Sequence, residues 1–128
     1  PGSGKNTLAM NLFVELQKAG RSSSWLNADS VRKMFGDQDF SIEGRLRQAR
    51  RMAELANHSS ADYVICDFVA PLEESRKIFD PDFIVWMNTI DKSQFEDTNV
   101  IFSKPLRVDL EITAWDTDKN IADILSRV

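Results

Sequence analysis

The chain has 128 residues, of which 42% are hydrophobic and 28% charged, and its formal net charge is −4. This length suits one domain with a real core, and the negative charge argues against a nucleic-acid partner, because nucleic-acid-binding surfaces are usually basic. The single cysteine, Cys66, excludes a disulfide framework and favours a reducing compartment, so we expect a cytoplasmic protein. No apolar run approaches the ~18 residues that cross a bilayer, and we therefore expect no membrane partner.

The chain begins with a segment typical of a phosphate-binding loop (P-loop). An amphipathic helix is expected directly after it, ending at Gly20. Glycines let backbone N–H groups turn onto a phosphate chain, a lysine bridges the terminal phosphates, and the helix N-terminus adds a favourable dipole. The alternative is a Gly-Ser turn that caps an ordinary helix. We expect ATP binding, with Lys5 catalytic as well. The residues that fit the second half of the pattern G-x-x-x-x-G-K-[ST] are Gly2, Ser3, Gly4, Lys5, Asn6 and Thr7.

Two features of this segment depart from the usual pattern. Asn6 stands where a Ser or Thr normally contacts magnesium. Its side-chain carbonyl oxygen can still face a cation, so we expect metal binding to be weakened rather than lost. A P-loop also follows a buried, central parallel strand, and we expect that strand and the leading glycine upstream of Pro1.

Further along, helices and strands alternate. The strands are continuous apolar runs, which is typical of a parallel sheet covered on both faces. We predict a single P-loop kinase domain over 1–128, an α/β three-layer P-loop NTPase fold with a parallel sheet flanked by helices. The expected strands cover 24–27, 63–69, 83–87 and 108–113, and the expected helices cover 5–19 and 29–35, begin at Ser41 and after Pro71, and include 121–128.

Two carboxylates follow expected strands. Asp67 ends the run Tyr63-Val64-Ile65-Cys66-Asp67, the form of a strand whose terminal carboxylate reaches magnesium. A plain turn after the strand is the alternative. Asp29 follows the preceding strand and could orient a metal-bound water or accept the proton of an attacking hydroxyl, although it could also cap a helix. We predict Asp67 and Asn6 as metal residues and Asp29 as a catalytic residue.

Arginines follow the same strand and fill the long helix. Arg32 lies three residues after Asp29, on the same helical face. A planar guanidinium suits phosphate or sulfate, so Arg32 and Arg45 favour a small anionic substrate. Phe40 could stack on a base or pack in the core. The arginines expected on a solvated face are Arg47, Arg50 and Arg51.

Three segments of roughly positions 1–87 resemble the adenylylsulfate kinase family. The family patterns are L-D-G-D-N-V-R, then G-F-S-x-x-D-R-x-x-N-x-R-R, then F-I-S-P followed by an arginine. The matching segments are Leu26-Asn27-Ala28-Asp29-Ser30-Val31-Arg32, Phe40-Ser41-Ile42-Glu43-Gly44-Arg45, and Asp67-Phe68-Val69-Ala70-Pro71 with Arg76. The resemblance implies a kinase of sulfate assimilation, usually a homodimer, that uses ATP and Mg²⁺ to phosphorylate the 3′-hydroxyl of adenosine 5′-phosphosulfate.

The resemblance also implies roles for individual residues. Asp29 is similar to the active-site aspartate, and Phe40 resembles the ring that packs on the adenine of the substrate. The residues implied to bind the substrate are Asp29, Arg32, Phe40, Arg45, Gln48 (at the family's Asn), Phe68 and Val69.

Four departures from the family pattern leave other functions open. Asn27 replaces the first Asp, Gly44 replaces the Asp before Arg45, and Ala70 replaces a serine and with it any phosphoserine. The stretch 88–104 lacks the arginines of the family's lid, so transition-state charge would depend on Lys5, magnesium and Arg76. The alternatives are a P-loop kinase for a sugar, antibiotic or nucleotide, and a nucleotide-binding regulatory module without catalysis.

Overall fold

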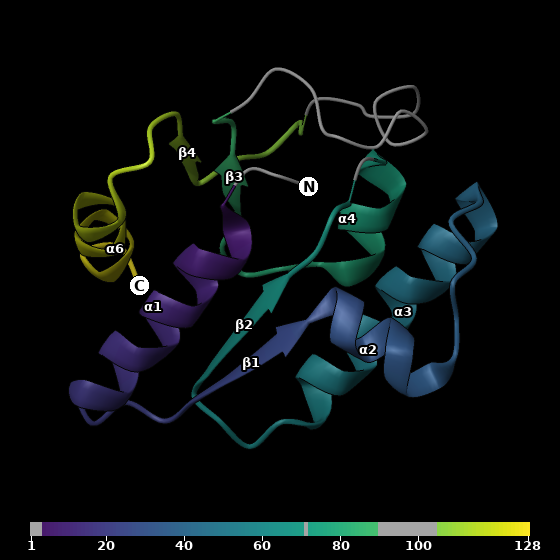
Figure 1. Cartoon of the computed structure of the whole chain (residues 1–128), viewed down its shortest axis with the longest axis horizontal. Coiled ribbons are helices and arrows are strands. Elements are labelled where there is room, and N and C mark those ends of the chain that lie inside the picture. The colour runs from purple at the N-terminus through teal and green to yellow at the C-terminus, as the bar shows by residue number, and fades with distance from the viewer. Residues whose placement is uncertain (1–3, 71, 90–104) are drawn as a thin grey trace.

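A computed structural model describes residues 4–70, 72–89 and 105–128 (Figure 1). Each helix and strand expected from the sequence within these ranges is present. None of the helices in the described part is long and apolar enough to cross a membrane. In chain order the elements are α1 (Lys5–Lys18), β1 (Ser23–Asn27), α2 (Ala28–Phe35), α3 (Ile42–His58), β2 (Tyr63–Asp67), α4 (Glu73–Phe79), β3 (Val85–Met87), β4 (Leu110–Ile112) and α6 (Thr117–Leu125).

The strands form two parallel pairs. β1 pairs with β2 so that Asn27 lies opposite Asp67 at the carboxyl ends, and β3 pairs with β4. No described strand hydrogen-bonds to both pairs, whereas the sequence predicted one sheet. The strand expected upstream of Pro1 lies outside the described residues and stays a prediction.

Helices cover the β1–β2 pair from two sides. α1 contacts both strands, α2 and α3 contact the same pair, α6 packs against α1, and α4 packs against α3. In Figure 1, α1 and α6 lie to one side of β1 and β2, while α2, α3 and α4 lie to the other. The predicted three layers therefore surround this pair, with the carboxyl ends of both strands directed toward one edge.

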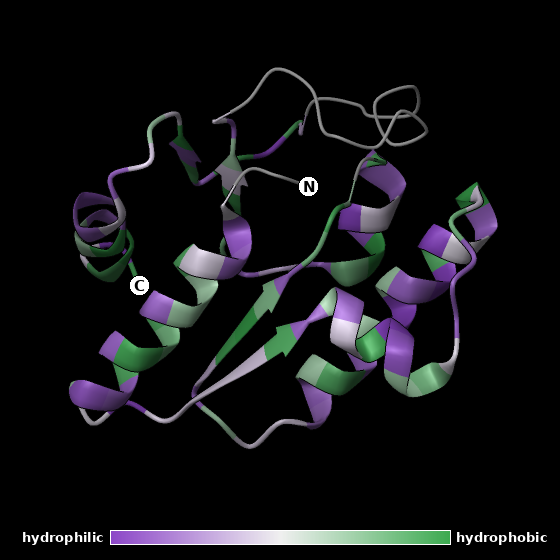
Figure 2. Ribbon diagram, viewed as in Figure 1, coloured by the Kyte–Doolittle hydropathy of each residue, from purple (hydrophilic) through white to green (hydrophobic). Residues whose placement is uncertain are grey.

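Two hydrophobic cores hold these layers together. The first joins α1, β4 and α6 through Leu8, Ile112, Ile121 and Ile124. The second joins β1 and β2 to α2 and α3 through buried side chains that include Met52. Figure 2 shows helices with hydrophobic and hydrophilic faces, as this packing requires. Each fully buried Leu, Ile or Met contributes about 1.5–3 kcal/mol, so the first core holds α1 in place and the second holds α2.

Two strands are shorter than the sequence predicted, because side-chain contacts replace the hydrogen bonds between strands at their ends. β2 ends at Asp67, two residues before the expected end, because Phe68 turns to pack edge-to-face on Phe79 at 5.3 Å between ring centroids. β3 begins at Val85 because the N–H of Ile84 donates to the side chain of Asp109 at 2.7 Å. These short strands still keep the predicted order.

Side-chain caps fix where α2 and α3 begin. The Asn27 side chain accepts from the N–H of Ser30 and caps α2, which starts with no intervening loop after β1. Ser41 caps α3 by accepting from the N–H of Gly44, as the sequence predicted. Gly36 ends α2 in a left-handed conformation and turns the chain toward α3.

Candidate active site

The N-terminus of α1 carries the described part of the predicted phosphate-binding loop. Gly4 precedes the helix with a left-handed backbone (φ +91°), a conformation that favours glycine. Lys5 and Thr7 lie in the first turn, and the Lys5 ammonium makes no hydrogen bond or ion pair within the described part of the chain. The remaining predicted loop residues, Gly2 and Ser3, lie outside the described residues.

The two predicted metal residues, Asn6 and Asp67, lie near the carboxyl ends of β1 and β2. Asn27 and Asp67 are register partners at these ends. Nδ2 of Asn27 donates to Oδ1 of Asp67 at 3.0 Å and to Oδ1 of Asn6 at 3.1 Å. Asn6 from α1 and Asp67 from β2 therefore converge on a single amide nitrogen from β1.

Hydrogen bonds fix the orientation of the groups around this point. Oδ1 of Asn27 accepts from the N–H and Oγ of Ser30, at 3.0 and 3.1 Å, so its nitrogen must face the carboxylate. The indole Nε1 of Trp25 donates to Oδ2 of Asp67. A cavity of about 370 Å³ is lined by Asn6, Trp25, Asn27 and Ser30. We call these four residues and Asp67 the strand-end site.

The strand-end site holds a buried carboxylate with neutral donors. Asp67 is 7% exposed, and no cationic side chain pairs with it in the described ranges. Burial, with a smaller contribution from Asp67, raises the pKa of the adjoining Cys66 thiol to about 12, so that thiol stays neutral. The negative charge of Asp67 is therefore not neutralised by its protein neighbours.

The oxygen donors of this site suit magnesium. Mg²⁺ is usually held by one or two carboxylates together with substrate phosphates, and the site offers the Asp67 carboxylate and the side-chain oxygen of Asn6. Both lie next to the helix end that would bind the phosphates. Across the described ranges, no three His, Cys, Asp or Glu side chains gather into a metal-binding group.

Asp29 lies beside the strand-end site with its carboxylate free. It is exposed in the first turn of α2, and it makes no hydrogen bond or ion pair with the described residues. The alternative that Asp29 caps the helix is wrong, because Asn27 provides that cap. The Asp29 carboxylate is thus accessible to a ligand.

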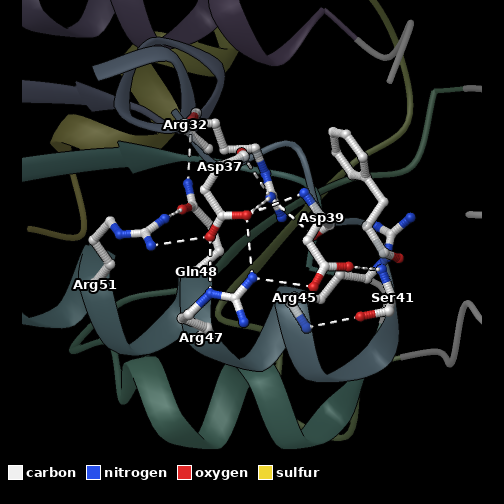
Figure 3. A network of polar contacts seen from close by, with 11 residues as sticks. Arg32, Asp37, Asp39, Ser41, Arg45, Arg47, Gln48 and Arg51 are labelled. Carbon is white, nitrogen blue, oxygen red and sulfur yellow. Dashed lines mark hydrogen bonds and ion pairs between the residues drawn. The ribbon is translucent and has the colours of Figure 1, made fainter. Parts of the chain in front are cut away.

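An arginine cluster connects α2, the following loop and α3 (Figure 3). Arg47 donates to both oxygens of Asp37, at 2.9 and 3.1 Å, and Arg51 donates to the same carboxylate at 3.0 Å. The expected solvated face is wrong for Arg51, whose side chain is 15% exposed, whereas Arg47 keeps 42% of its side chain exposed and Arg50 is exposed as expected. The members of the cluster are Arg32, Asp37, Asp39, Arg45, Arg47 and Arg51.

The two aspartates of this cluster are both paired with arginines. Hydrogen bonds from Arg47, and then from the Asp39 backbone and Arg51, hold the pKa of Asp37 well below its usual range. The same contact with Asp37 raises the pKa of Arg47 above its usual range. These groups stay ionised near neutral pH, and their main work is to fix the loop between α2 and α3.

Arg32 and Arg45 support an exposed aromatic ring. Nη1 of Arg32, a residue 5% exposed, donates to the carbonyl groups of Asp37 and Asp39 at 3.3 and 3.1 Å. Nε of Arg45 donates to the carbonyl of Phe40 at 2.8 Å. The guanidinium carbons of Arg32 and Arg45 lie 4.3 and 5.5 Å from the centroid of the Phe40 ring. Phe40 is 44% exposed, so the alternative that it packs in the core is wrong.

Gly44 accommodates this loop at the start of α3. A Cβ at this position would lie 2.2 Å from the carbonyl oxygen of Asp39. The family pattern has an aspartate here, and the close approach of Asp39 explains why this chain requires glycine.

Several other residues predicted to touch a ligand are wholly or partly buried in the protein. Gln48 is buried, donates to the carbonyl of Ala28 at 3.1 Å and accepts from Arg51 at 2.7 Å. Phe68 packs in the second core, and the adjacent Val69 is half-buried. Arg76 donates to the carbonyl of Ala70 at 2.9 Å and lies 3.7 Å from Glu73. The lid residues 90–104 lie outside the described residues.

Sequence reasoning missed three residues of this region. Trp25 precedes Asn27 by two positions, and this strand spacing, which puts both side chains on one face, was the available signal. Asp37 gave no motif signal because its role depends on two arginines of the next helix. Trp115 lies against the P-loop, where a Cβ on Gly4 would come within 2.6 Å of its ring.

Comparison with known proteins identifies the family. The family model described as adenylylsulphate kinase matches residues 1–91, more than half of the chain. The chain belongs to this family. A probable adenylyl-sulfate kinase of Aeropyrum pernix is 32% identical over 130 residues, which cover 92% of this chain and 71% of the relative. An adenylyl-sulfate kinase of Thermodesulfovibrio yellowstonii is 39% identical over 80 residues, which cover 60% of this chain and 40% of that protein.

Solved structures of adenylylsulfate kinases share the fold. The Mycobacterium tuberculosis APS kinase CysC in complex with AMPPNP and APS superposes with a TM-score of 0.83 at 22% identity, over 98% of this chain and 90% of that chain. This likeness confirms the predicted α/β P-loop NTPase fold. The assignment to the family rests on the sequence matches.

Proposed function

We propose that the chain is an ATP-dependent kinase that transfers the γ-phosphate of ATP to the 3′-hydroxyl of adenosine 5′-phosphosulfate. The observation that carries this proposal is the adenylylsulfate kinase match over 1–91. The geometry supports it, since the free Lys5 ammonium, the α1 N-terminus and the strand-end site adjoin one another. Phosphoryl transfer requires chiefly positioning and charge stabilisation, and these groups supply both.

The ATP side of the site depends on α1 and the strand-end site. The N-terminus of α1 and Lys5 bind the terminal phosphates, because unpaired N–H groups and an unpaired ammonium favour an anion there. When bound, Mg²⁺ would be held by Asp67 and Asn6 and would neutralise charge on the phosphates. Asp67 is buried beside neutral donors, so its charge is available for this purpose.

The acceptor side depends on Asp29. Its carboxylate is exposed and makes no hydrogen bond or ion pair within the described chain, and in sequence it lies between Asn27 and Ser30 of the strand-end site. A carboxylate in this position can accept a hydrogen bond from the acceptor hydroxyl and take its proton during transfer. Asp29 is therefore the residue that orients the nucleophile.

Phe40 provides a platform for the acceptor's base. The ring is exposed, and Arg32 and Arg45 hold its loop through backbone carbonyls. A fixed ring binds a planar base at low entropic cost. Arg32 and Arg45 thus act on the acceptor mainly through the position of Phe40.

We also propose a homodimer, as the family resemblance implies. Met34, Phe35 and Ile42 expose 73%, 52% and 54% of their surface at the end of α2 and the start of α3, and apolar side chains of this kind are typical of a protein interface. Light scattering during gel filtration should give twice the mass of the chain. A monomer at all concentrations would refute this part of the proposal.

An acceptor panel tests the proposed function. Purified protein is incubated with ATP, Mg²⁺ and one acceptor, and ADP release and the phosphorylated product are both measured. Adenosine 5′-phosphosulfate should give a 3′-phosphorylated product, whereas adenosine 5′-phosphate and a neutral sugar should not. A protein that binds ATP and phosphorylates no acceptor would instead be a nucleotide-binding module, and the proposal would be wrong.

A further inference from the structure

The strand-end site contains a carboxylate and an amide at directly opposed positions of two parallel strands. Asn27 and Asp67 are register partners, and Nδ2 of Asn27 donates to Oδ1 of Asp67 at 3.0 Å. Adjacent strands lie about 4.8 Å apart, so side chains at the two positions can reach a common point. A carboxylate at position 27 or at position 67 would therefore lie in the same part of the site.

The family pattern quoted above assigns a carboxylate to the other member of this pair. L-D-G-D has its first aspartate at position 27, where this chain has asparagine. The chain has a buried aspartate across the ladder instead. We infer that Asp67 carries the carboxylate that the family pattern places at position 27, and that Asn27 and Trp25 are its positioning residues. This inference rests on the proposed function.

The hydrogen bonds give each of these residues a separate task. Ser30 saturates the oxygen of Asn27, which directs Nδ2 toward Asp67 and Asn6. Trp25 donates to the second carboxylate oxygen and thereby fixes the rotation of the carboxyl group. Neither Asn27 nor Trp25 carries charge, so both hold the carboxylate without neutralising it.

A structural role for Asp67 would leave a different pattern of effects. A carboxylate that only accepts bonds from Trp25 and Asn27 would stabilise the fold and have no influence on a cation. A carboxylate that serves the Mg²⁺–nucleotide complex must affect metal-dependent binding, and it must be replaceable by a carboxylate on the opposed strand. The exchange of the two residues separates these roles.

The experiment measures binding of a non-hydrolysable ATP analogue by calorimetry, with and without Mg²⁺, and uses no acceptor. Asp67→Asn should weaken Mg²⁺-dependent binding at least about tenfold, as the loss of one charge-assisted contact predicts, and should change Mg²⁺-free binding little. Asn27→Asp combined with Asp67→Asn should recover most of that loss. Asp62→Asn, at an exposed residue directly before the first residue of β2, is the matched control and should have no effect.

A spectroscopic readout tests the positioning residues. The indole N–H resonance of Trp25, assigned with Trp25→Phe, should move in Asp67→Asn and when Mg²⁺ and the analogue are added to the wild type. Trp25→Phe should weaken Mg²⁺-dependent binding several-fold in the wild type and add little in the Asp67→Asn background. These two measurements decide the question even if the exchanged variant does not fold.

Two results would overturn the inference. One is Asp67→Asn protein that binds the Mg²⁺–analogue complex as the wild type does. The other is a folded exchanged variant that binds no better than Asp67→Asn. Since no acceptor is present, wild-type protein that fails to phosphorylate adenosine 5′-phosphosulfate would refute the proposed function and leave this test intact.

Discussion

The arginine cluster and the strand-end site use charge in opposite ways. In the arginine cluster, the Asp37 carboxylate is paired within the protein with Arg47 and Arg51. In the strand-end site, the buried carboxylate of Asp67 is held by an indole and an amide, both neutral. Charge that is paired within the protein fixes a loop, whereas charge held by neutral donors is available to a ligand. The arginine cluster has more charged residues than the strand-end site, but this number alone does not identify it as the region that binds the ligand.

Lys5→Ala should give the largest effect and test the ligand side of this comparison. Removal of the ammonium that we propose faces the terminal phosphates should lower kcat by on the order of 10²–10³, with a loss of ATP affinity. Steady-state kinetics and calorimetry measure both quantities. Lys18→Ala, at the exposed far end of α1, is the control and should behave as the wild type. Unchanged ATP binding in Lys5→Ala would remove the basis for the phosphate site.

Asp29→Asn should sharpen the comparison on the acceptor side. The substitution keeps the shape of the side chain and removes the group that we propose accepts the proton, so kcat should fall about 10²-fold or more while the acceptor KM changes little. The measurement is initial rate against acceptor concentration. A rise in KM at constant kcat would instead assign Asp29 to substrate binding.

Gly4→Ala tests whether Trp115 restricts the P-loop. Any residue with a Cβ is strained by about 1–2 kcal/mol at a left-handed φ, and at Gly4 the new Cβ would also meet the Trp115 ring at 2.6 Å. Gly20→Ala is the matched control, because Gly20 also has a positive φ (+71°) but no atom within 4 Å of the added Cβ. Urea unfolding should show the larger loss for Gly4→Ala, with weaker nucleotide binding in that variant alone. Equal losses would mean that the ring moves freely.

Asp37→Asn should remove the ion pairs of the arginine cluster and lower the stability of the fold by an amount that depends on pH. Because the folded-state pKa of Asp37 is lowered, its stabilising contribution is fully present above the unfolded value of about 3.9 and is lost as the pH falls toward the folded value. The variant should therefore unfold at lower urea than the wild type at pH 5–7, and the difference should shrink below about pH 4. A difference that does not change with pH would mean that the ion pairs contribute nothing.

The parts of this molecule that follow local rules were predictable from the sequence. Ser41 caps its helix, Asp67 ends an apolar strand, and Asn6 and Asp67 both accept from the side chain of Asn27. Tertiary contacts decided the rest. Gln48 and Arg51 form hydrogen bonds with each other and with residues outside α3. The helical pattern of the sequence could not show that these side chains are already used within the protein. The register of two strands, which opposes Asn27 to Asp67, likewise depends on pairing over long sequence separation.

One thermal-unfolding experiment tests the division between the two regions most directly. Wild type, Asp67→Asn and Asp37→Asn are melted with and without Mg²⁺ and a non-hydrolysable ATP analogue, which raises Tm only where it binds the folded state. We predict that Asp37→Asn has a lower Tm without ligand and retains the ligand-induced rise. Asp67→Asn should melt a few degrees lower without ligand, because the new amide offers one oxygen to two donors, Trp25 and Asn27, and it should lose most of the ligand-induced rise. The account is contradicted if Asp67→Asn keeps the full rise, or if Asp37→Asn loses it.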